Sequence, residues 1–200
     1  MEIKGGSPAT TTYAEAAFVD TPTSFCSGAL VSRRVVVTAG HCVTASRFTV
    51  TVPAVNRRAT ASKKWTDYRP IPGSVNPDAV DVAVIVLDTP IELPTYPKLA
   101  SEPAADGTKA VNVGRMRNGQ PSTMMFKGDP VALEQSIGYP FAYETPAVAE
   151  HGDLGGPVYV GTGIGRTIVA VNSGATDEVQ ILARVDLVRD QIRRMIAQNP

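Results

Sequence analysis

Short runs of β-branched and apolar residues recur along most of the chain, separated by Gly, Pro, Asn and Asp. In the stretch Phe48-Thr49-Val50-Thr51-Val52 apolar and polar residues alternate strictly, whereas Val82 to Leu87 is continuously apolar. Alternation is typical of a strand with one buried face, and a short apolar run is typical of a strand buried on both faces. Similar runs occur at 29–31, 35–37, 110–113, 156–160, 167–171 and 179–183. Many short strands separated by turn residues predict an all-β barrel or sandwich.

The last segment follows a different period. Apolar residues at positions 187, 188, 192, 195 and 196 have the spacing of one face of a helix. The pattern predicts an amphipathic C-terminal helix over about residues 186–198 that docks on the β structure, with Asp186 as its N-cap.

Composition narrows the classes of partner. The chain of 200 residues is suited to one domain, and its 19 basic and 19 acidic residues cancel. We therefore expect binding neither to nucleic acid nor to a membrane surface. No apolar run approaches the roughly 18–20 residues that a membrane-spanning helix needs. The opening Met1-Glu2-Ile3-Lys4 lacks the pattern of a secretory signal, so either a signal has been removed or the protein is not exported.

Two cysteines, Cys26 and Cys42, stand sixteen positions apart. Their spacing alone leaves open whether they are two buried thiols or one disulfide. The cysteines and the histidines lack the spacing of zinc ligands, so we expect no metal and no cofactor.

Three segments carry candidate chemistry in the order His, Asp and a glycine-rich loop. They are Thr38-Ala39-Gly40-His41-Cys42, the run DVAVIVLD that begins at Asp81, and Gly152-Asp153-Leu154-Gly155-Gly156-Pro157. Hydrolysis by a serine needs an attacking hydroxyl, an imidazole that takes its proton and a carboxylate that orients the imidazole. His41 and Asp81 have the chemistry of the base and the orienting group, but Leu154 has no nucleophilic atom.

These segments resemble the TAAHC, DIALLKL and GDSGGP motifs of the trypsin/chymotrypsin-like serine protease family. Residues 25–30 are similar to its CGGSLI strand, and Ile3-Lys4-Gly5-Gly6 to its IVGG amino terminus. Residues 136–140, Ser-Ile-Gly-Tyr-Pro, are similar to a segment of bacterial glutamyl endopeptidase relatives, which indicates a bacterial-type member.

The resemblance implies a fold and its division. We expect two six-stranded antiparallel β-barrels with a C-terminal α-helix, the trypsin-like fold. Subdomain 1 is expected over about residues 1–100 and subdomain 2 over about 101–185. A disulfide joining Cys26 and Cys42 is implied as well, which favours a secreted or periplasmic location.

The resemblance also implies the site residues. His41, Asp81 and position 154 are the catalytic positions, and the backbone N–H groups of Gly152 and Leu154 form the oxyanion hole. Ile3 and Asp153 are the activation pair, in which a freed amino group pairs with the carboxylate. Val148, Ala170 and Asn172 are expected in the specificity pocket, which then favours a small or medium apolar residue.

Leu154 is the departure that decides the functional prediction. Losing the nucleophile of such a triad removes on the order of 10⁶ in turnover. Ser173 and Ser136 carry hydroxyls, but neither is favoured as a replacement. We expect a serine endopeptidase domain that is inactive as written and gains activity on Leu154→Ser. The alternative is a natural pseudoprotease that holds a peptide or protein in the cleft between the barrels without cutting it.

Overall fold

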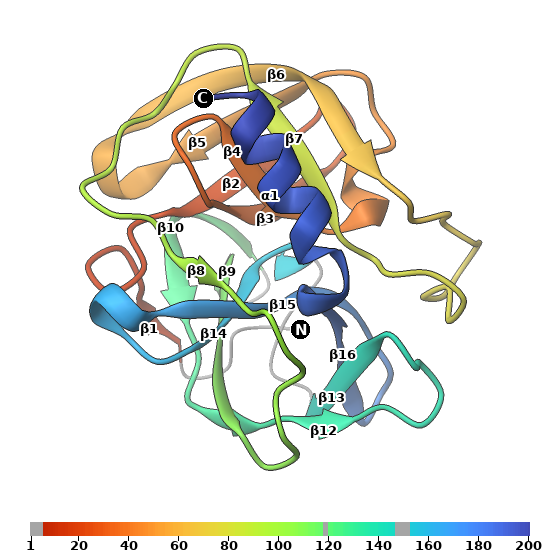
Figure 1. The fold of residues 1–200 in the computed structure, drawn as a ribbon. Helices are drawn as coiled ribbons and strands as arrows, with labels where there is room; N and C mark the ends of the chain where they lie inside the picture. Colours follow the sequence, from red (N-terminus) through yellow and green to blue (C-terminus); the bar gives the residue numbers. More distant parts are fainter. Residues whose placement is uncertain (1–5, 118–119, 147–152) are drawn as a thin grey trace.

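The computed structural model of the protein describes residues 6–117, 120–146 and 153–200. Six strands of the first half close into a barrel in the order β2-β3-β4-β7-β6-β5, shown in red to yellow in Figure 1. The strands are β2 Ala16–Asp20, β3 Phe25–Leu30, β4 Val35–Thr38, β5 Phe48–Val52, β6 Arg57–Thr66 and β7 Ala83–Leu87.

The burial of these strands follows from their sequence patterns. In β5 the residues Phe48, Val50 and Val52 are buried while the threonines between them are half-buried. All five residues of β7 are buried, as its continuous apolar run predicts. The strand that follows Asp81 therefore lies in the centre of the barrel wall, paired with β4 on one side and β6 on the other.

The second half is a sheet that runs in the order β1-β10-β9-β14-β15-β16-β13-β12. Its long strands are β9 Lys109–Arg117, β10 Gln120–Lys127, β13 Ala142–Pro146, β14 Pro157–Val160, β15 Thr167–Ala175 and β16 Val179–Arg184. Its short strands are β1 Ser7–Pro8, β8 Lys98–Leu99, β11 Val131–Ala132 and β12 Glu134–Gln135. The strand β8 pairs with β15 in parallel, and β11 pairs with β9.

The expected all-β, trypsin-like fold with one C-terminal helix is confirmed. The second half differs from the expectation in detail, because its sheet has ten strands in the part of the chain that the structure describes, rather than six. Four of these strands are two-residue pairings, too short to leave a period-two pattern in the sequence.

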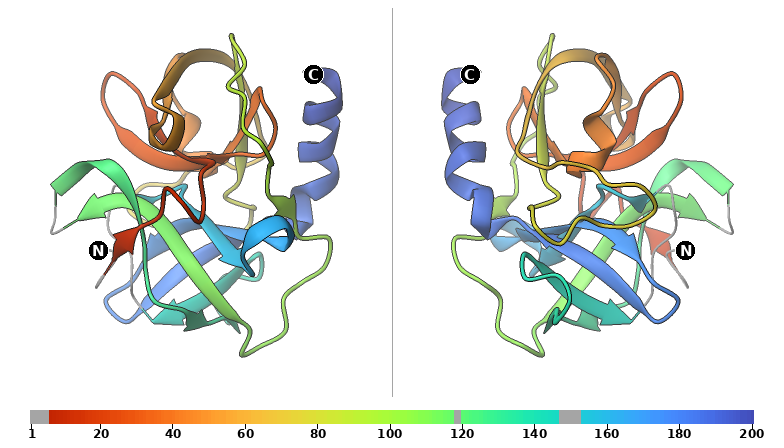
Figure 2. Two further views of the ribbon diagram at one scale, coloured as in Figure 1. Left: turned by 90° about the vertical axis from the view of Figure 1, so that its left-hand side faces the viewer. Right: turned by 90° about the vertical axis from the view of Figure 1, so that its right-hand side faces the viewer.

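The helix α1, Arg189–Gln198, lies along the side of the first barrel in both views of Figure 2. Its Ile192 and Met195 are buried in the same apolar cluster as the core of that barrel. The expected cap at Asp186 is wrong, because the N-cap residue is Val188 and a 3-10 turn, Asp186–Val188, precedes the helix. The Asp186 carboxylate instead accepts two hydrogen bonds from the Arg184 guanidinium, 2.7 and 3.1 Å long.

A buried ion pair ties the amino-terminal segment to the second half. Glu15, which has no exposed surface, accepts a hydrogen bond from Arg166 Nε at 2.7 Å and one from the Tyr159 hydroxyl at 3.1 Å. Arg166 also donates to Gly163 O and to both oxygen atoms of Thr95. These hydrogen bonds thereby join three parts of the chain: Glu15 just before β2, Thr95 in the connection between the two halves, and Arg166 in the second half.

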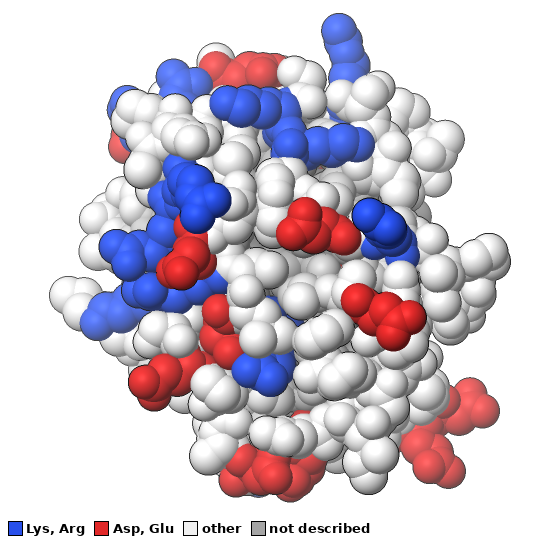
Figure 3. All heavy atoms as spheres, turned by 45° about the vertical axis from the view of Figure 1, so that its right-hand side comes forward, with Lys and Arg blue, Asp and Glu red and all other residues white. Residues whose placement is uncertain are grey.

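Charge on the surface is mixed in sign. On the face shown in Figure 3, lysine and arginine side chains lie among aspartate and glutamate side chains. Within the described residues, no helix has both the length and the apolar character that a membrane crossing requires.

Candidate functional site

His41 lies at the edge of the first barrel in a single 3-10 turn, η1 Gly40–Val43, directly after β4. Its backbone is held close to Tyr68, because a Cβ atom on the preceding Gly40 would lie 2.4 Å from Tyr68 Cβ. The His41 ring is 27% exposed, so one edge of the imidazole faces solvent. Strand β4 and the close packing at Gly40 therefore fix where the imidazole sits.

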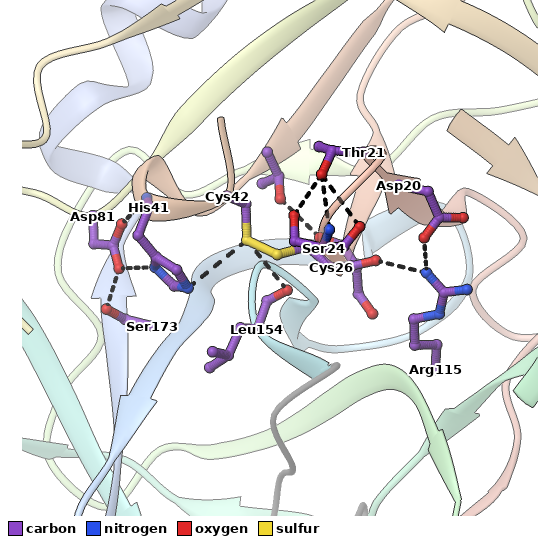
Figure 4. Close-up of a disulfide and its surroundings, with 12 residues drawn as sticks. Asp20, Thr21, Ser24, Cys26, His41, Cys42, Asp81, Arg115, Leu154 and Ser173 are labelled. Atoms are coloured by element: carbon purple, nitrogen blue, oxygen red, sulfur yellow. Dashed lines mark hydrogen bonds and ion pairs between the residues drawn. A yellow bond between two sulfur atoms is a disulfide. The ribbon is translucent and has the colours of Figure 1, made fainter. Parts of the chain in front are cut away.

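Asp81 lies just before β7 and is 2% exposed. Its Oδ1 accepts the backbone N–H of His41 at 2.8 Å, and its Oδ2 lies 2.7 Å from His41 Nδ1. Ser173 Oγ donates to the same Oδ2 at 2.5 Å. Because an ionised carboxylate only accepts, neutral His41 carries its proton on Nδ1 and presents a lone pair on Nε2. Figure 4 shows the imidazole between this carboxylate and the disulfide.

The cysteines form the disulfide Cys26–Cys42, which joins β3 to the turn that carries His41. The sulfur of Cys42 lies 3.8 Å from His41 Nε2 and 3.8 Å from the carbonyl oxygen of Leu154. Cys26, His41 and Cys42 are the group of possible metal ligands within the described residues. Since both sulfurs are bonded to one another, they are not available as thiolates for a metal.

Leu154 belongs to the second half of the molecule but is hydrogen-bonded to the first half. Its carbonyl oxygen accepts the backbone N–H of Ser27 at 2.9 Å. Its side chain is half-buried and packs against the large apolar cluster. A backbone hydrogen bond that does not involve its side chain therefore links residue 154 to β3.

Gly155 is required by both conformation and space. Its φ is +84°, and a Cβ atom there would lie 2.3 Å from Thr38 Oγ1 and 2.4 Å from Ser27 O. Its N–H donates to Asn172 O at 2.7 Å, while the next residue, Gly156, donates to Asp153 O at 2.9 Å. The loop thus packs directly against β3 and β4 of the first barrel.

One cleft contains the predicted catalytic positions. A hollow of about 560 Å³ is lined by His41, Asp81 and Leu154 together with residues 70, 71 and 73–75 and the end of β15. Tyr68 lies at its edge; burial raises the pKa of this phenol, the Asn76 N–H bonded to its oxygen opposes the rise, and the Asp81 charge adds to it. The cleft brings groups from both halves of the molecule to one place.

Several predicted site residues lie elsewhere or outside the described residues. Ala170 and Asn172 are fully buried and do not line the cleft, where the same strand contributes Ser173, Gly174 and Ala175 instead. The shift coincides with an irregularity in the pairing of β15 with β16 between Asn172 and Gly174. Gly152, Val148 and Ile3 lie outside the described residues.

Asp153 points away from the cleft toward β9. It is fully buried, and its Oδ1 accepts the backbone N–H of Met116 at 2.9 Å. A Cβ atom on Gly114 would lie 2.1 Å from the same oxygen, so the carboxylate occupies the space that this glycine leaves. Its pairing with Ile3 stays a prediction.

The two serines have defined partners. Ser173 Oγ bonds Asp81 on the Nδ1 side of the imidazole, not beside Nε2. Ser136 Oγ donates to Glu144 at 2.6 Å and is not among the residues of the cleft. No sequence pattern predicts the contact of Ser173 with Asp81, because 92 positions separate the two residues.

A barrel that presents a carboxylate-bound histidine to a glycine-rich loop of a second β half is the architecture of the double-barrel serine proteases. The family model described as Trypsin matches residues 3–192. The chain therefore belongs to the trypsin family and is a trypsin-like serine protease domain.

Among solved structures, the chain is similar to a mutant of human heparin binding protein. The TM-score is 0.76 at 21% sequence identity, and the match covers 98% of this chain and 97% of that one. At this identity the likeness concerns the fold. Comparison with curated proteins finds no significant match.

Proposed function

We propose that this chain is a serine endopeptidase domain that does not hydrolyse peptides as written, because Leu154 stands at the nucleophile position. The observation that supports it most strongly is the hydrogen-bonded set His41–Asp81–Ser173, because His41 lines a cleft that is also lined by Leu154. Without a side-chain hydroxyl at position 154, His41 has no protein nucleophile there to activate.

The decisive experiment restores the hydroxyl. Leu154→Ser is treated with a fluorophosphonate probe and then with a peptide library, beside the native chain. Both are prepared in full length and in forms that begin at Ile3. We expect labelling and cleavage in the serine form alone, and absence of both from a folded serine form contradicts the proposal.

A second candidate function is favoured by the open cleft. A hollow of about 560 Å³ remains beside Leu154, lined by apolar side chains and by the end of β15. In this function the native chain is a pseudoprotease that binds a peptide or protein segment without cutting it. The native chain should then show saturable peptide binding, and His41→Ala should weaken that binding. If the cleft plays no part in partner binding, His41→Ala would leave the binding affinity unchanged.

Two finer assignments accompany the proposal. The disulfide is compatible with a secreted or periplasmic location, where such bonds persist. The similarity of residues 136–140 to bacterial glutamyl endopeptidase relatives supports a bacterial branch of the family.

A further inference from the structure

Gln180 is the buried polar residue of the cleft that the hydrogen-bonded set of His41, Asp81 and Ser173 does not use. It lies in β16, directly opposite Ala175 of β15 on one side and Thr145 of β13 on the other. The residue has no exposed surface, yet it lines the same hollow as His41 and Leu154.

Both polar atoms of this side chain lack a partner. Gln180 Oε1 and Nε2 are buried and make no hydrogen bond within the part of the chain that the structure describes. A buried amide without partners is costly, and buried polar groups in folded proteins are nearly always bonded. An unsatisfied donor and acceptor on a residue that lines a cleft point to a ligand that bonds both.

The surroundings define the ligand. Besides Gln180, the cleft is lined by the apolar residues Ile71 and Val75 and by Gly174. The charged group of the described lining is Asp81, and its carboxylate already accepts three hydrogen bonds. A lysine or arginine side chain would find no free counter-ion here, and a carboxylate would pair with Nε2 but leave Oε1 unsatisfied.

We infer that Gln180 determines specificity and that the cleft accepts a peptide side chain ending in a carboxamide, glutamine or asparagine. The carbonyl oxygen of the ligand amide accepts from Gln180 Nε2, and its NH₂ group donates to Gln180 Oε1. Two amides in antiparallel register thus satisfy each other. This inference rests on the proposed function and replaces the expected preference for an apolar residue.

The test uses Leu154→Ser and four substrates, acetyl-Ala-Ala-Ala-X-aminomethylcoumarin with X as Gln, Met, Glu or Lys. Gln and Met side chains have similar length and differ in the amide. We expect kcat/KM for Gln to exceed that for Met by at least about tenfold, since a site built around hydrogen bonds disfavours a ligand that cannot make them.

The variant Gln180→Met in the same background keeps the volume of the side chain and removes the amide. We expect it to abolish the preference for Gln over Met. The matched control is Asn112→Leu, because Asn112 is also fully buried, its two amide atoms make no hydrogen bond with the described residues, and it does not line the cleft. It should leave the ratio unchanged, although both variants remove a buried unsatisfied amide.

The outcomes separate the two proposals. Cleavage by Leu154→Ser with equal or better use of Met, or a Gln preference that survives Gln180→Met, overturns the role of Gln180 and leaves the proposed function standing. If Leu154→Ser shows no probe labelling and cleaves none of the four substrates, the proposed function is overturned, and the role of Gln180 is overturned with it.

Discussion

The two sides of the cleft differ in how completely their polar groups are bonded. On the His41 side, Asp81 accepts three hydrogen bonds, and the imidazole is held in one orientation. On the opposite side, position 154 has an aliphatic side chain, and Gln180 has a buried amide with no partner in the described residues. The polar groups on the first side satisfy one another's hydrogen bonds, whereas the amide of Gln180 on the second side is satisfied only by a ligand.

The difference indicates that the residues around His41 and the residues around Gln180 can change independently of one another in this fold. Carboxylate, imidazole and Ser173 satisfy one another without reference to residue 154. We therefore expect an exchange at position 154 to change the nucleophile position while leaving His41 in place. Each of the following predictions changes one side of the cleft and measures whether the other side responds.

The largest effect is expected for His41→Ala in the Leu154→Ser background. Because nucleophile and base act as a unit, the loss of kcat is expected to be on the order of 10⁶, about as large as removing the introduced serine again. Single-turnover hydrolysis of a coumarin peptide measures it. A much smaller loss would show that the introduced serine is activated without His41.

Asp81→Asn in the same background tests the orienting group. The amide can donate to His41 Nδ1 and so favours the wrong tautomer, and the expected loss of kcat is about 10⁴. The loss should appear in kcat with KM nearly unchanged. Asp88→Asn is the control, since its carboxylate accepts a hydrogen bond from Thr60 at an exposed site instead.

Removal of the disulfide by the double change Cys26→Ala and Cys42→Ala affects both sides together. The bond closes a loop of 16 positions, and its loss is expected to lower the free energy of unfolding by about 3 kcal/mol. Urea unfolding followed by circular dichroism measures this change. An unchanged midpoint would show that the packing of β3 against the His41 turn suffices.

Gly155→Ala tests the contact between the Leu154 loop and the first barrel. The φ of +84° and the 2.4 Å approach to Ser27 O predict a loss of about 2 kcal/mol in stability. Gly73→Ala is the matched control, because Gly73 has a φ of +74° but open space around it. The control should cost about 1 kcal/mol or less, and equal losses would argue against the close contact.

The smallest effect is expected for Ser173→Ala in the Leu154→Ser background. It removes one of three hydrogen bonds to Asp81, and kcat is expected to fall about tenfold, the equivalent of one such bond. Ser136→Ala, which removes a hydroxyl bonded to Glu144, should have no effect on kcat. A complete loss for Ser173→Ala would assign that serine a direct part in the chemistry.

The sequence predicted the features that local patterns encode. The β class, the central apolar strand after Asp81 and the terminal helix follow from periodicity, and the Cys26–Cys42 bond followed from the family resemblance. The start of the helix was predicted three residues early because Asp186 bonds Arg184, a contact that competes with capping.

Features that depend on strand register were not accessible from the sequence. Which residues of β15 face the cleft is set by the irregular pairing between Asn172 and Gly174. The family resemblance implied Ala170 and Asn172 for the specificity pocket, whereas Ser173, Gly174 and Ala175 of the same strand line the cleft. Gln180 was missed because its environment depends on pairing with β13, which is distant in sequence, as well as with the neighbouring strand β15.

The backbone bond from Ser27 to the Leu154 carbonyl has an evolutionary consequence. This hydrogen bond involves main-chain atoms alone, so we expect a change of the side chain at position 154 to leave it in place. Some leucine and serine codons differ by a single base. Under the proposed function, we expect that a lineage with this scaffold can cross between a cutting and a non-cutting form in one genetic step while ligand recognition is retained.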